Sequence, residues 1–230
     1  MEREKKIFYQ EIAYILGVCL IAFSTAAAEA ANFGVSMVVA PSYLFHLKIS
    51  ETIPFVTFGI AEYCFQGILL ILLVIIMRKF KLTYIFAFVT AVFYGLALDG
   101  FIWVLSFVPK EILAIRIIFY VLSIFVCSFG VSLLFHTYIS PEVYELFVKE
   151  VSNKYGFTMH KFKTFYDCTS CIIAIIMSFI FFGFGNFEGV KWGTVICALL
   201  NGFLIGRFSS FMEKRFDFKV KLPKFQKLFK

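Results

Sequence analysis

Few ionisable or amide side chains interrupt the long apolar runs of this sequence, and these few are the candidates for chemistry. Glu62 lies inside the run from Ile53 to Lys81, with Tyr63 beside it and Gln66 one helical turn further on. A carboxyl group in such a run is costly unless it faces a partner, a cavity or water. The position therefore predicts a polar site for an ion or a small molecule.

A second carboxyl group, Asp167, lies near the start of a later apolar run. If Asp167 and Glu62 meet in a central cavity of low dielectric constant, one of them should hold a proton near neutral pH, because two adjacent carboxylates do not both ionise there. That arrangement suits a proton-coupled or cation-binding carrier. The competing interpretation is structural, with Asp167 paired to Lys163 or Arg207 and Glu62 hydrogen-bonded to a Tyr or Ser side chain.

Other polar residues belong either to the predicted route for an ion or substrate or to the predicted charge pairs. Asp99 and Arg116 should lie near the same membrane boundary, where pairing would offset their desolvation. The predicted route for an ion or substrate comprises Glu62, Asp167, Glu29, Asp99, Tyr63, Gln66 and Asn201. The predicted charge pairs involve Asp99, Arg116, Lys163 and Arg207.

Established catalytic patterns do not occur in the sequence. It contains no G-x-S-x-G, H-E-x-x-H, P-loop or dinucleotide fingerprint. Cys168-Thr-Ser-Cys171 has the spacing of a redox or metal motif, but no second pair accompanies it, so packing is the favoured interpretation. The sequence predicts no enzyme activity, no cofactor and no metal site.

The composition indicates which kind of secondary-structure element positions these residues. The chain is 61% hydrophobic and only 16% charged, which is too apolar for a soluble surface. The stretch from Ile53 to Lys81 holds about 24 nearly continuous apolar residues, enough to cross a bilayer core of roughly 30 Å. Five further runs of this kind predict an all-α membrane protein with six transmembrane helices. The net charge of +7 comes from helix ends and the tail, so nucleic acid is not expected as a partner.

The distribution of positive charge predicts the orientation in the cell membrane. With both termini in the cytoplasm, eighteen of the 22 Lys and Arg residues lie on the inner side, and Lys48, Lys110, Arg116 and Lys191 lie outside. Lys alternates with apolar residues in the tail, residues 213–230, so the tail is expected to bind anionic lipid headgroups. Stripes of small residues allow close helix contacts, and a homodimer is one arrangement open to them.

The two halves of the chain share a layout. Residues 1–108 contain three spans and a predicted broken segment at 32–48, for which a long tilted helix is the alternative. Residues 109–212 contain three more spans and a predicted amphipathic helix on the inner surface at 140–152. Pro41 precedes one span as Pro141 precedes its counterpart, and Cys64 aligns with Cys168. Because each half has an odd number of spans, the two repeats should be inverted, as in many secondary transporters.

Four segments carry a resemblance to a known family: GVSMVVAPSYLF, FGIAEYCFQGILLILL, RKFKLTYIFAFVTAVFYGLALDGF and WGTVICALLNGFLIGRF. From about Gly17 to Arg207 the chain resembles the YitT/YczE-type family of bacterial inner-membrane proteins. That resemblance implies a six-span fold in the inner membrane but no established activity. Members often carry a Gly-Pro-Arg-Asp-like turn after the fourth span, where this chain has Ser140-Pro141-Glu142. Chemistry that depends on that Arg-Asp pair is therefore not implied here.

These expectations lead to two functional hypotheses. In the first, the protein is a small secondary transporter or exporter, whose acidic residues line a central cavity for a small molecule or an ion. In the second, it is a membrane scaffold or accessory subunit that docks a partner through its inner helix and basic tail. Glu62→Gln and Asp167→Asn should abolish pH-dependent binding or flux only in the first case.

Overall fold

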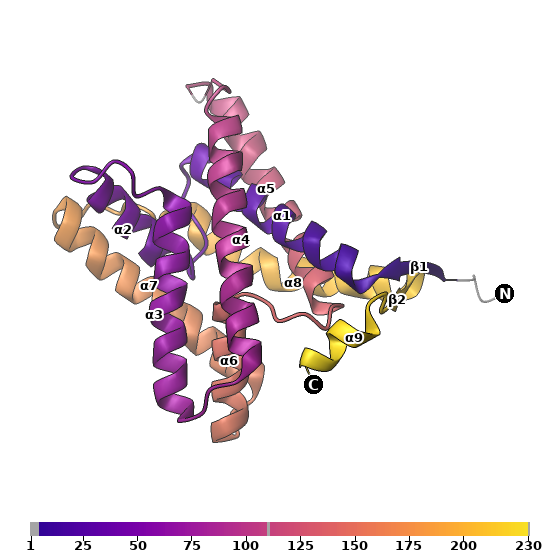
Figure 1. Cartoon of the computed structure of the whole chain (residues 1–230). Coiled ribbons are helices and arrows are strands. Elements are labelled where there is room, and N and C mark those ends of the chain that lie inside the picture. Colours follow the sequence, from indigo (N-terminus) through magenta and orange to yellow (C-terminus); the bar gives the residue numbers. More distant parts are fainter. Residues whose placement is uncertain (1–4, 110, 230) are drawn as a thin grey trace.

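The computed structural model describes residues 5–109 and 111–229 and consists almost entirely of helices (Figure 1). Arg3, Lys110 and Lys230, which entered the comparison of charges, lie outside these residues. Six of the described helices are long and apolar enough to cross a membrane, so this is a membrane-spanning helical protein, as predicted. They are α1 (Gln10–Ala31), α3 (Phe58–Met77), α4 (Leu82–Leu105), α5 (Leu113–Phe135), α7 (Met159–Phe182) and α8 (Trp192–Arg215).

Two shorter helices, α2 (Ala40–Ser50) and α6 (Val143–Tyr155), lie between the spans. The helix that starts at Gln10 ends at Ala31 and is capped by Asn32, whose φ of 55° is left-handed; after seven further residues the chain resumes at Ala40 as α2. Of the two alternatives for residues 32–48, the structure therefore has the break. Figure 1 shows α2 near one end of α3 and α6 near the other end.

The position of α6 differs from the predicted amphipathic helix on the membrane surface at 140–152. Its apolar face packs against α3, α4 and α7, and the buried residues include Val143, Tyr144 and Val148. Neighbouring helices thus cover the surface that lipid was expected to cover. Lys149 and Lys154, which lie toward the far end of the helix, remain exposed.

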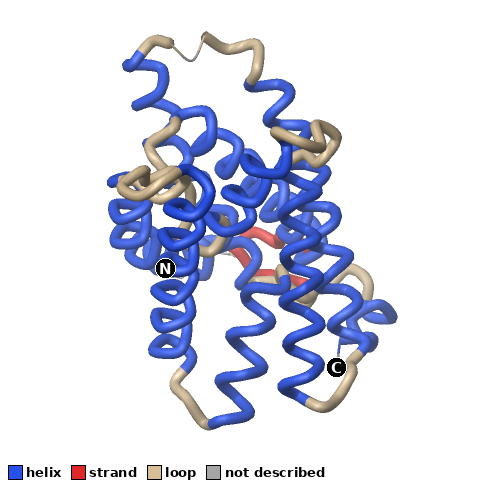
Figure 2. Tube along the Cα trace, turned by 90° about the vertical axis from the view of Figure 1, so that its left-hand side faces the viewer, coloured by secondary structure: helices blue, strands red, loops and turns tan. Residues whose placement is uncertain are grey.

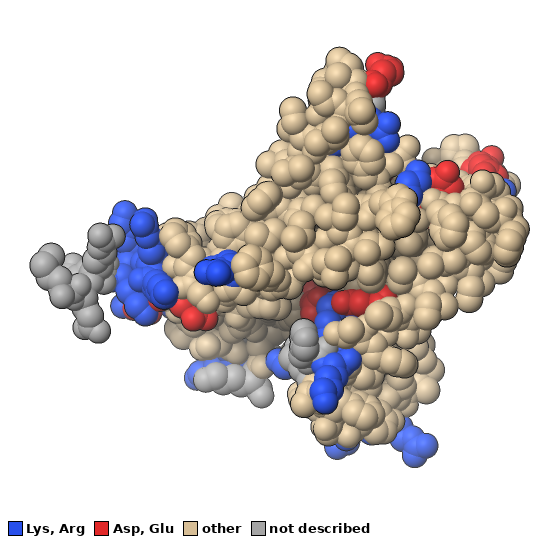
Figure 3. All heavy atoms as spheres, turned by 180° about the vertical axis from the view of Figure 1, so that it is seen from behind, with Lys and Arg blue, Asp and Glu red and all other residues tan. Residues whose placement is uncertain are grey.

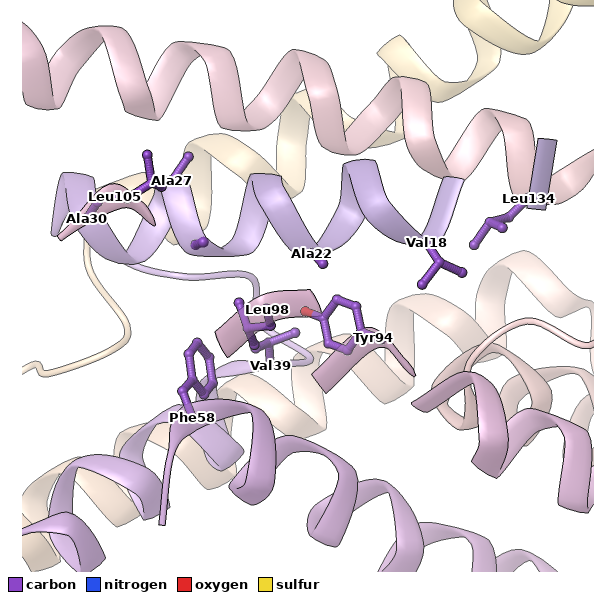
Figure 4. Packing of buried hydrophobic residues seen from close by; sticks show 11 residues of the cluster. Val18, Ala22, Ala27, Ala30, Val39, Phe58, Tyr94, Leu98, Leu105 and Leu134 are labelled. Carbon is purple, nitrogen blue, oxygen red and sulfur yellow. The ribbon is translucent and has the colours of Figure 1, made fainter. Parts of the chain in front are cut away.

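The core is built around α1, which packs against α4 and α5. One face of α1 is formed by buried alanines, and this smooth surface lets larger side chains approach closely. Figure 4 shows Tyr94 and Leu98 of α4 between α1 and the start of α3, where Phe58 lies. The hydroxyl of Tyr94 donates to Thr25 at 2.9 Å, so the polar end of this buried ring is satisfied.

The two ends of the chain are joined by a pair of short parallel strands, β1 (Lys6–Tyr9) and β2 (Phe216–Lys219) (Figure 2). The second strand, β2, is followed by α9 (Pro223–Gln226) and a 3-10 turn, η1 (Lys227–Phe229). Glu11 accepts hydrogen bonds from the backbone N–H groups of Lys221 and Leu222. The region predicted as a separate basic tail is thus docked on the N-terminal segment, and the lysine side chains that the structure describes there, from Lys214 to Lys227, are exposed.

Candidate functional site

Glu62 is fully buried on the second turn of α3, with none of its surface exposed. The hydroxyl of Ser42, on the first turn of α2, contacts its Oε2 atom. This part of α2 is held in place by burial of Ala40, Pro41 and Leu44. The predicted polar position on α3 therefore faces protein, and its partner comes from the helix that follows the break.

Gln66 connects Glu62 to a second buried carboxyl group, Glu142, which is the N-cap residue of α6. The Gln66 amide nitrogen lies 3.4 Å from Glu62 Oε1 and 3.2 Å from Glu142 Oε2. Its amide oxygen accepts a hydrogen bond of 3.0 Å from the backbone N–H of Val143. We refer to the side chains of Glu62, Gln66 and Glu142 as the acid-amide cluster.

The cluster lies where the N-terminal ends of α2 and α6 meet. Ser42 is on the first turn of α2, while the far end of that helix lies near the start of α3, where His46 contacts the Val56 carbonyl at 2.9 Å. The far end of α6 lies near the opposite end of α3, where Lys154 donates to the Ile76 carbonyl. Two short helices thus run from opposite ends of α3 and direct their positive dipole ends at the buried carboxyl groups.

Electrostatics at the cluster favour a neutral acid over a second anion. Burial, with the neighbouring Glu62 and Glu145 carboxylates, raises the pKa of Glu142 to about 8. Tyr144 of α6 is buried, and its hydroxyl interacts with Glu62. The cluster therefore has a buried hydroxyl group beside its first carboxyl group.

Asp167 is not part of this cluster. It pairs with Lys163 at 3.2 Å, and Lys163 also pairs with Glu145 at 3.0 Å. All three side chains are partly exposed, between 28 and 32%. The structure therefore has the pairing of Asp167 with Lys163 that the competing interpretation gives, and Asp167 makes no direct contact with Glu62 among the described hydrogen bonds.

Arg207 does not take part in that ion pair. It is exposed, and its guanidinium lies 5.1 Å from the ring centre of Phe203 on the same helix. Figure 3 shows a face that is mostly uncharged, with charged side chains near its ends and one recess that holds charges of both signs. Such a distribution suits a surface that faces lipid.

The predicted pair of Asp99 and Arg116 does not form. Asp99 accepts hydrogen bonds from the Thr57 hydroxyl at 2.5 Å and from the Gly59 N–H at 2.8 Å, so it stabilises the start of α3. Arg116 Nε donates to the Ala31 carbonyl at 2.8 Å, at the end of α1. Both charged groups thus satisfy helix ends, which sequence spacing alone does not reveal.

The remaining predicted residues lie in three different places. Tyr63 packs where α3 meets α4, and its ring comes close to Gly95. Asn201 joins α8 to α5 through a hydrogen bond of 3.0 Å from Ser128. Glu29 lines an open hollow of about 500 Å³ together with Tyr43 and seven other residues. Ser42, which contacts Glu62, is the neighbour of Tyr43 in α2, so this hollow lies close to the cluster.

Glu142 is the functional candidate that the sequence reasoning missed. The sequence places it only in the predicted amphipathic helix at 140–152, directly after Ser140 and Pro141. The signal was present in the repeat: if Pro41 corresponds to Pro141, the next residues, Ser42 and Glu142, correspond as well. In the structure these two residues contact Glu62 and Gln66, respectively.

No group of three or more His, Cys, Asp or Glu side chains is arranged to hold a metal ion within the described ranges.

A family model described as a family of unknown function (DUF6198) matches residues 8–210. No curated protein matches the chain, and no solved structure does.

Proposed function

This chain belongs to the DUF6198 family of unknown function, and we propose that it is a small secondary transporter that uses the acid-amide cluster to bind its coupling ion or substrate. It resides in the cell membrane as a multi-pass protein with both termini in the cytoplasm. The clustering of Arg78, Lys79 and Lys81 at the turn between α3 and α4 supports that orientation. The relation to YitT/YczE-type proteins is part of the same proposal, because it concerns the same six-span layout.

One observation carries the proposal: two buried carboxyl groups lie between the tips of two short helices that run from opposite ends of the bundle. Buried ionisable groups among spanning helices mark ion or substrate sites by default. Interrupted helices whose N-terminal ends meet inside the protein recur at the binding sites of secondary transporters. A purely structural cluster has no need of two acids, since apolar side chains would fill the same volume at lower cost.

The contacts between helices support an inverted repeat of residues 1–108 and 109–212. In the first half α1 packs against α4, and in the second half α5 packs against α8 in the same way. Each short helix packs against a span of the other half, α6 against α3 and α2 against α7. This exchange places the cluster between the two halves, where a relative movement would expose it to one side and then to the other.

The charged groups on either side of the cluster suggest a route. The hollow lined by Glu29, Tyr43 and Leu47 opens on the side of α2. On the side of α6, Glu145 and Lys163 lie near Glu142 and are partly exposed. A cation or proton that enters at the hollow would thus pass Glu62, Gln66 and Glu142 before it reaches Lys163 and its partners.

The rival hypothesis, a membrane scaffold, finds less support. It requires a free amphipathic helix and a free basic tail, whereas α6 is packed among the spans and the tail is paired with the N-terminal strand. We propose no enzymatic role.

Transport can be tested in proteoliposomes that contain a pH-sensitive dye. Sodium, potassium, ethylammonium, tetraethylammonium and spermidine would be applied in turn across the membrane, because a carboxylate site favours cations. At least one of them should drive proton movement in the wild-type protein and fail to do so in Glu62→Gln and Glu142→Gln. The exposed Glu213→Gln serves as the matched control and should behave as the wild type. The proposal is contradicted if no probe gives a response, or if all four proteins respond equally.

A further inference from the structure

The hydroxyl of Ser42 lies within hydrogen-bonding distance of two acceptors, although it has one proton to donate. One acceptor is the Val39 carbonyl oxygen, at 2.7 Å, and the other contact is Glu62 Oε2. A carbonyl oxygen and an ionised carboxylate both only accept, so a single hydroxyl proton does not serve the two of them fully. Both contacts are complete hydrogen bonds at once if Ser42 donates to Val39 and Glu62 Oε2 carries a proton that it donates to Ser42.

We infer that Glu62 is protonated in this conformation and that the ion bound by the acid-amide cluster is a proton rather than a metal cation. This inference rests on the proposed function and deepens it, because it names the coupling ion. Two carboxylates buried side by side cannot both keep their charge, so the cluster holds one proton in preference to none. Glu62 is the residue whose hydrogen-bond geometry requires that proton.

The amide of Gln66 argues against a metal ion. Its nitrogen lies between the two carboxyl groups, at 3.4 Å from Glu62 and 3.2 Å from Glu142, in the position that a bridging cation would need. The orientation of the amide follows from the hydrogen bond that its oxygen accepts from Val143 N–H at 3.0 Å. With its two N–H groups directed at the acids, Gln66 supplies positive hydrogens where sodium or calcium would require oxygen ligands.

The buried hydroxyl of Tyr144 lies beside Glu62 and interacts with it. When Glu62 releases its proton, the new carboxylate can accept from Tyr144 and competes with Val39 for the Ser42 proton. Loss of the proton therefore rearranges the contact that joins the tip of α2 to α3.

Among the residues that the structure describes, the cation that acts on the cluster is Lys163. Lys163 is shared between Glu145 and Asp167, so it does not neutralise Glu62 directly. Burial first and Glu62 second raise the pKa of Glu142, so Glu142 favours its neutral form as well. The other titratable groups that act on the two acids are Tyr14 from α1, Tyr94 from α4, Cys127 from α5, Tyr144 and Glu145 from α6, and Lys163 and Tyr166 from α7.

Infrared spectroscopy of the purified full-length protein tests the inference, because a protonated carboxyl group has a C=O band that a carboxylate lacks. We expect such a band at neutral pH in the wild type and in Glu213→Gln, and the loss of its Glu62 component in Glu62→Gln, where Glu142 supplies the component that remains. Ser42→Ala removes the acceptor of the Glu62 proton, so the band should shift in frequency, whereas Ser42→Thr should restore it. The serine variants keep the test decisive if Glu62→Gln does not fold. Excess sodium, potassium or calcium chloride should leave the band unchanged.

The outcomes separate this inference from the proposed transport. A wild type without the band, a band that is unchanged in Glu62→Gln, or a Ser42→Ala spectrum identical to the wild type would overturn the inference. Loss of the band on addition of sodium or calcium would show a metal site and overturn it too, while transport would stand. A band that behaves as expected, in a protein that moves no protons in proteoliposomes, would contradict the transport function alone.

Discussion

The two halves of this protein share a layout but differ in how their last two helices pack. In the first half α3 crosses α4 at Gly59 and Gly95, where a Cβ atom on Gly59 would stand 2.0 Å from the Gly95 carbonyl oxygen. In the second half α7 makes no comparable contact with α8, and at Gly202 and Gly206 no packing atom from the rest of the described chain lies within 4 Å. The same pattern of small residues is thus a tight crossing in one half and an open face in the other.

This difference explains where the acid-amide cluster lies. The tight crossing fixes α3 on α4, and α3 carries Glu62 and Gln66. Asp167, on the loosely packed α7, is partly exposed and has a lysine one turn away. A buried acid needs a rigid setting that keeps water out. The crossing of α3 with α4 provides it for Glu62, and Glu142 of the second half reaches the same setting because α6 packs against α3. The comparison therefore centres the ion site on α3, away from the loosely packed α7.

The largest expected effect is at the crossing itself. Gly59→Ala places a methyl group against the backbone of Gly95 and the carboxylate of Asp99, neither of which can give way easily. We expect a loss in free energy of unfolding of about 3 kcal/mol, at the upper end of overpacking effects. The matched variant Gly202→Ala should change it by less than about 1 kcal/mol, because a methyl group there meets open space. Unfolding in mixed detergent micelles measures the stability of both variants. Equal losses of stability would contradict the difference in packing between the two halves.

The next expected effect is the dependence of stability on pH that the Glu142 carboxyl group causes. Its pKa of about 8 in the folded protein exceeds the ordinary value of 4.5, so the folded state binds more protons than the unfolded state between these values. The free energy of unfolding should therefore fall as the pH rises from about 4.5 to about 8. Glu142→Gln should flatten that dependence, and Asp167→Asn, in the other half, should leave it in place. A wild-type stability that rises with pH over this interval would contradict the assignment.

A smaller effect is expected for the ion pairs of α7. Asp167→Asn removes one of two acidic partners of a partly exposed lysine, and such pairs contribute about 1 kcal/mol or less. Lys163 keeps its contact with Glu145 at 3.0 Å, so folding and transport should persist. Thermal unfolding and the proteoliposome assay would check this, and loss of transport in Asp167→Asn would return Asp167 to the ion route.

The last prediction compares how much the side-chain caps at the starts of α3 and α7 stabilise the fold. The Thr57 hydroxyl accepts a hydrogen bond from Ile60 N–H and donates to Asp99, whereas Thr158 at the start of α7 makes no capping bond with its side chain. Thr57→Ala should lower the free energy of unfolding by about 1 kcal/mol, and Thr158→Ala should leave it almost unchanged. Chemical denaturation distinguishes the two, and equal costs would argue against a firmer first half.

Much of this arrangement could be predicted from local pattern. The six spans follow from the length of their apolar runs, and a polar site at Glu62 follows from the cost of a carboxyl group in such a run. What could not be predicted is which distant groups meet. Asp99 and Arg116 satisfy helix ends, and Glu142 reaches Gln66 because α6 folds back among the spans. Contacts of that kind depend on tertiary packing, which hydrophobic pattern does not encode.

The most direct test of the central claim, that the acid-amide cluster is the ion-binding centre, is the current that follows a rapid pH jump on proteoliposomes adsorbed to a solid-supported membrane. Uptake of a proton at a buried site displaces charge across the membrane, even when no other substrate is present. The account predicts a transient current in the wild type and in Glu213→Gln that disappears in Glu62→Gln. Currents of the same size in all three proteins would contradict it.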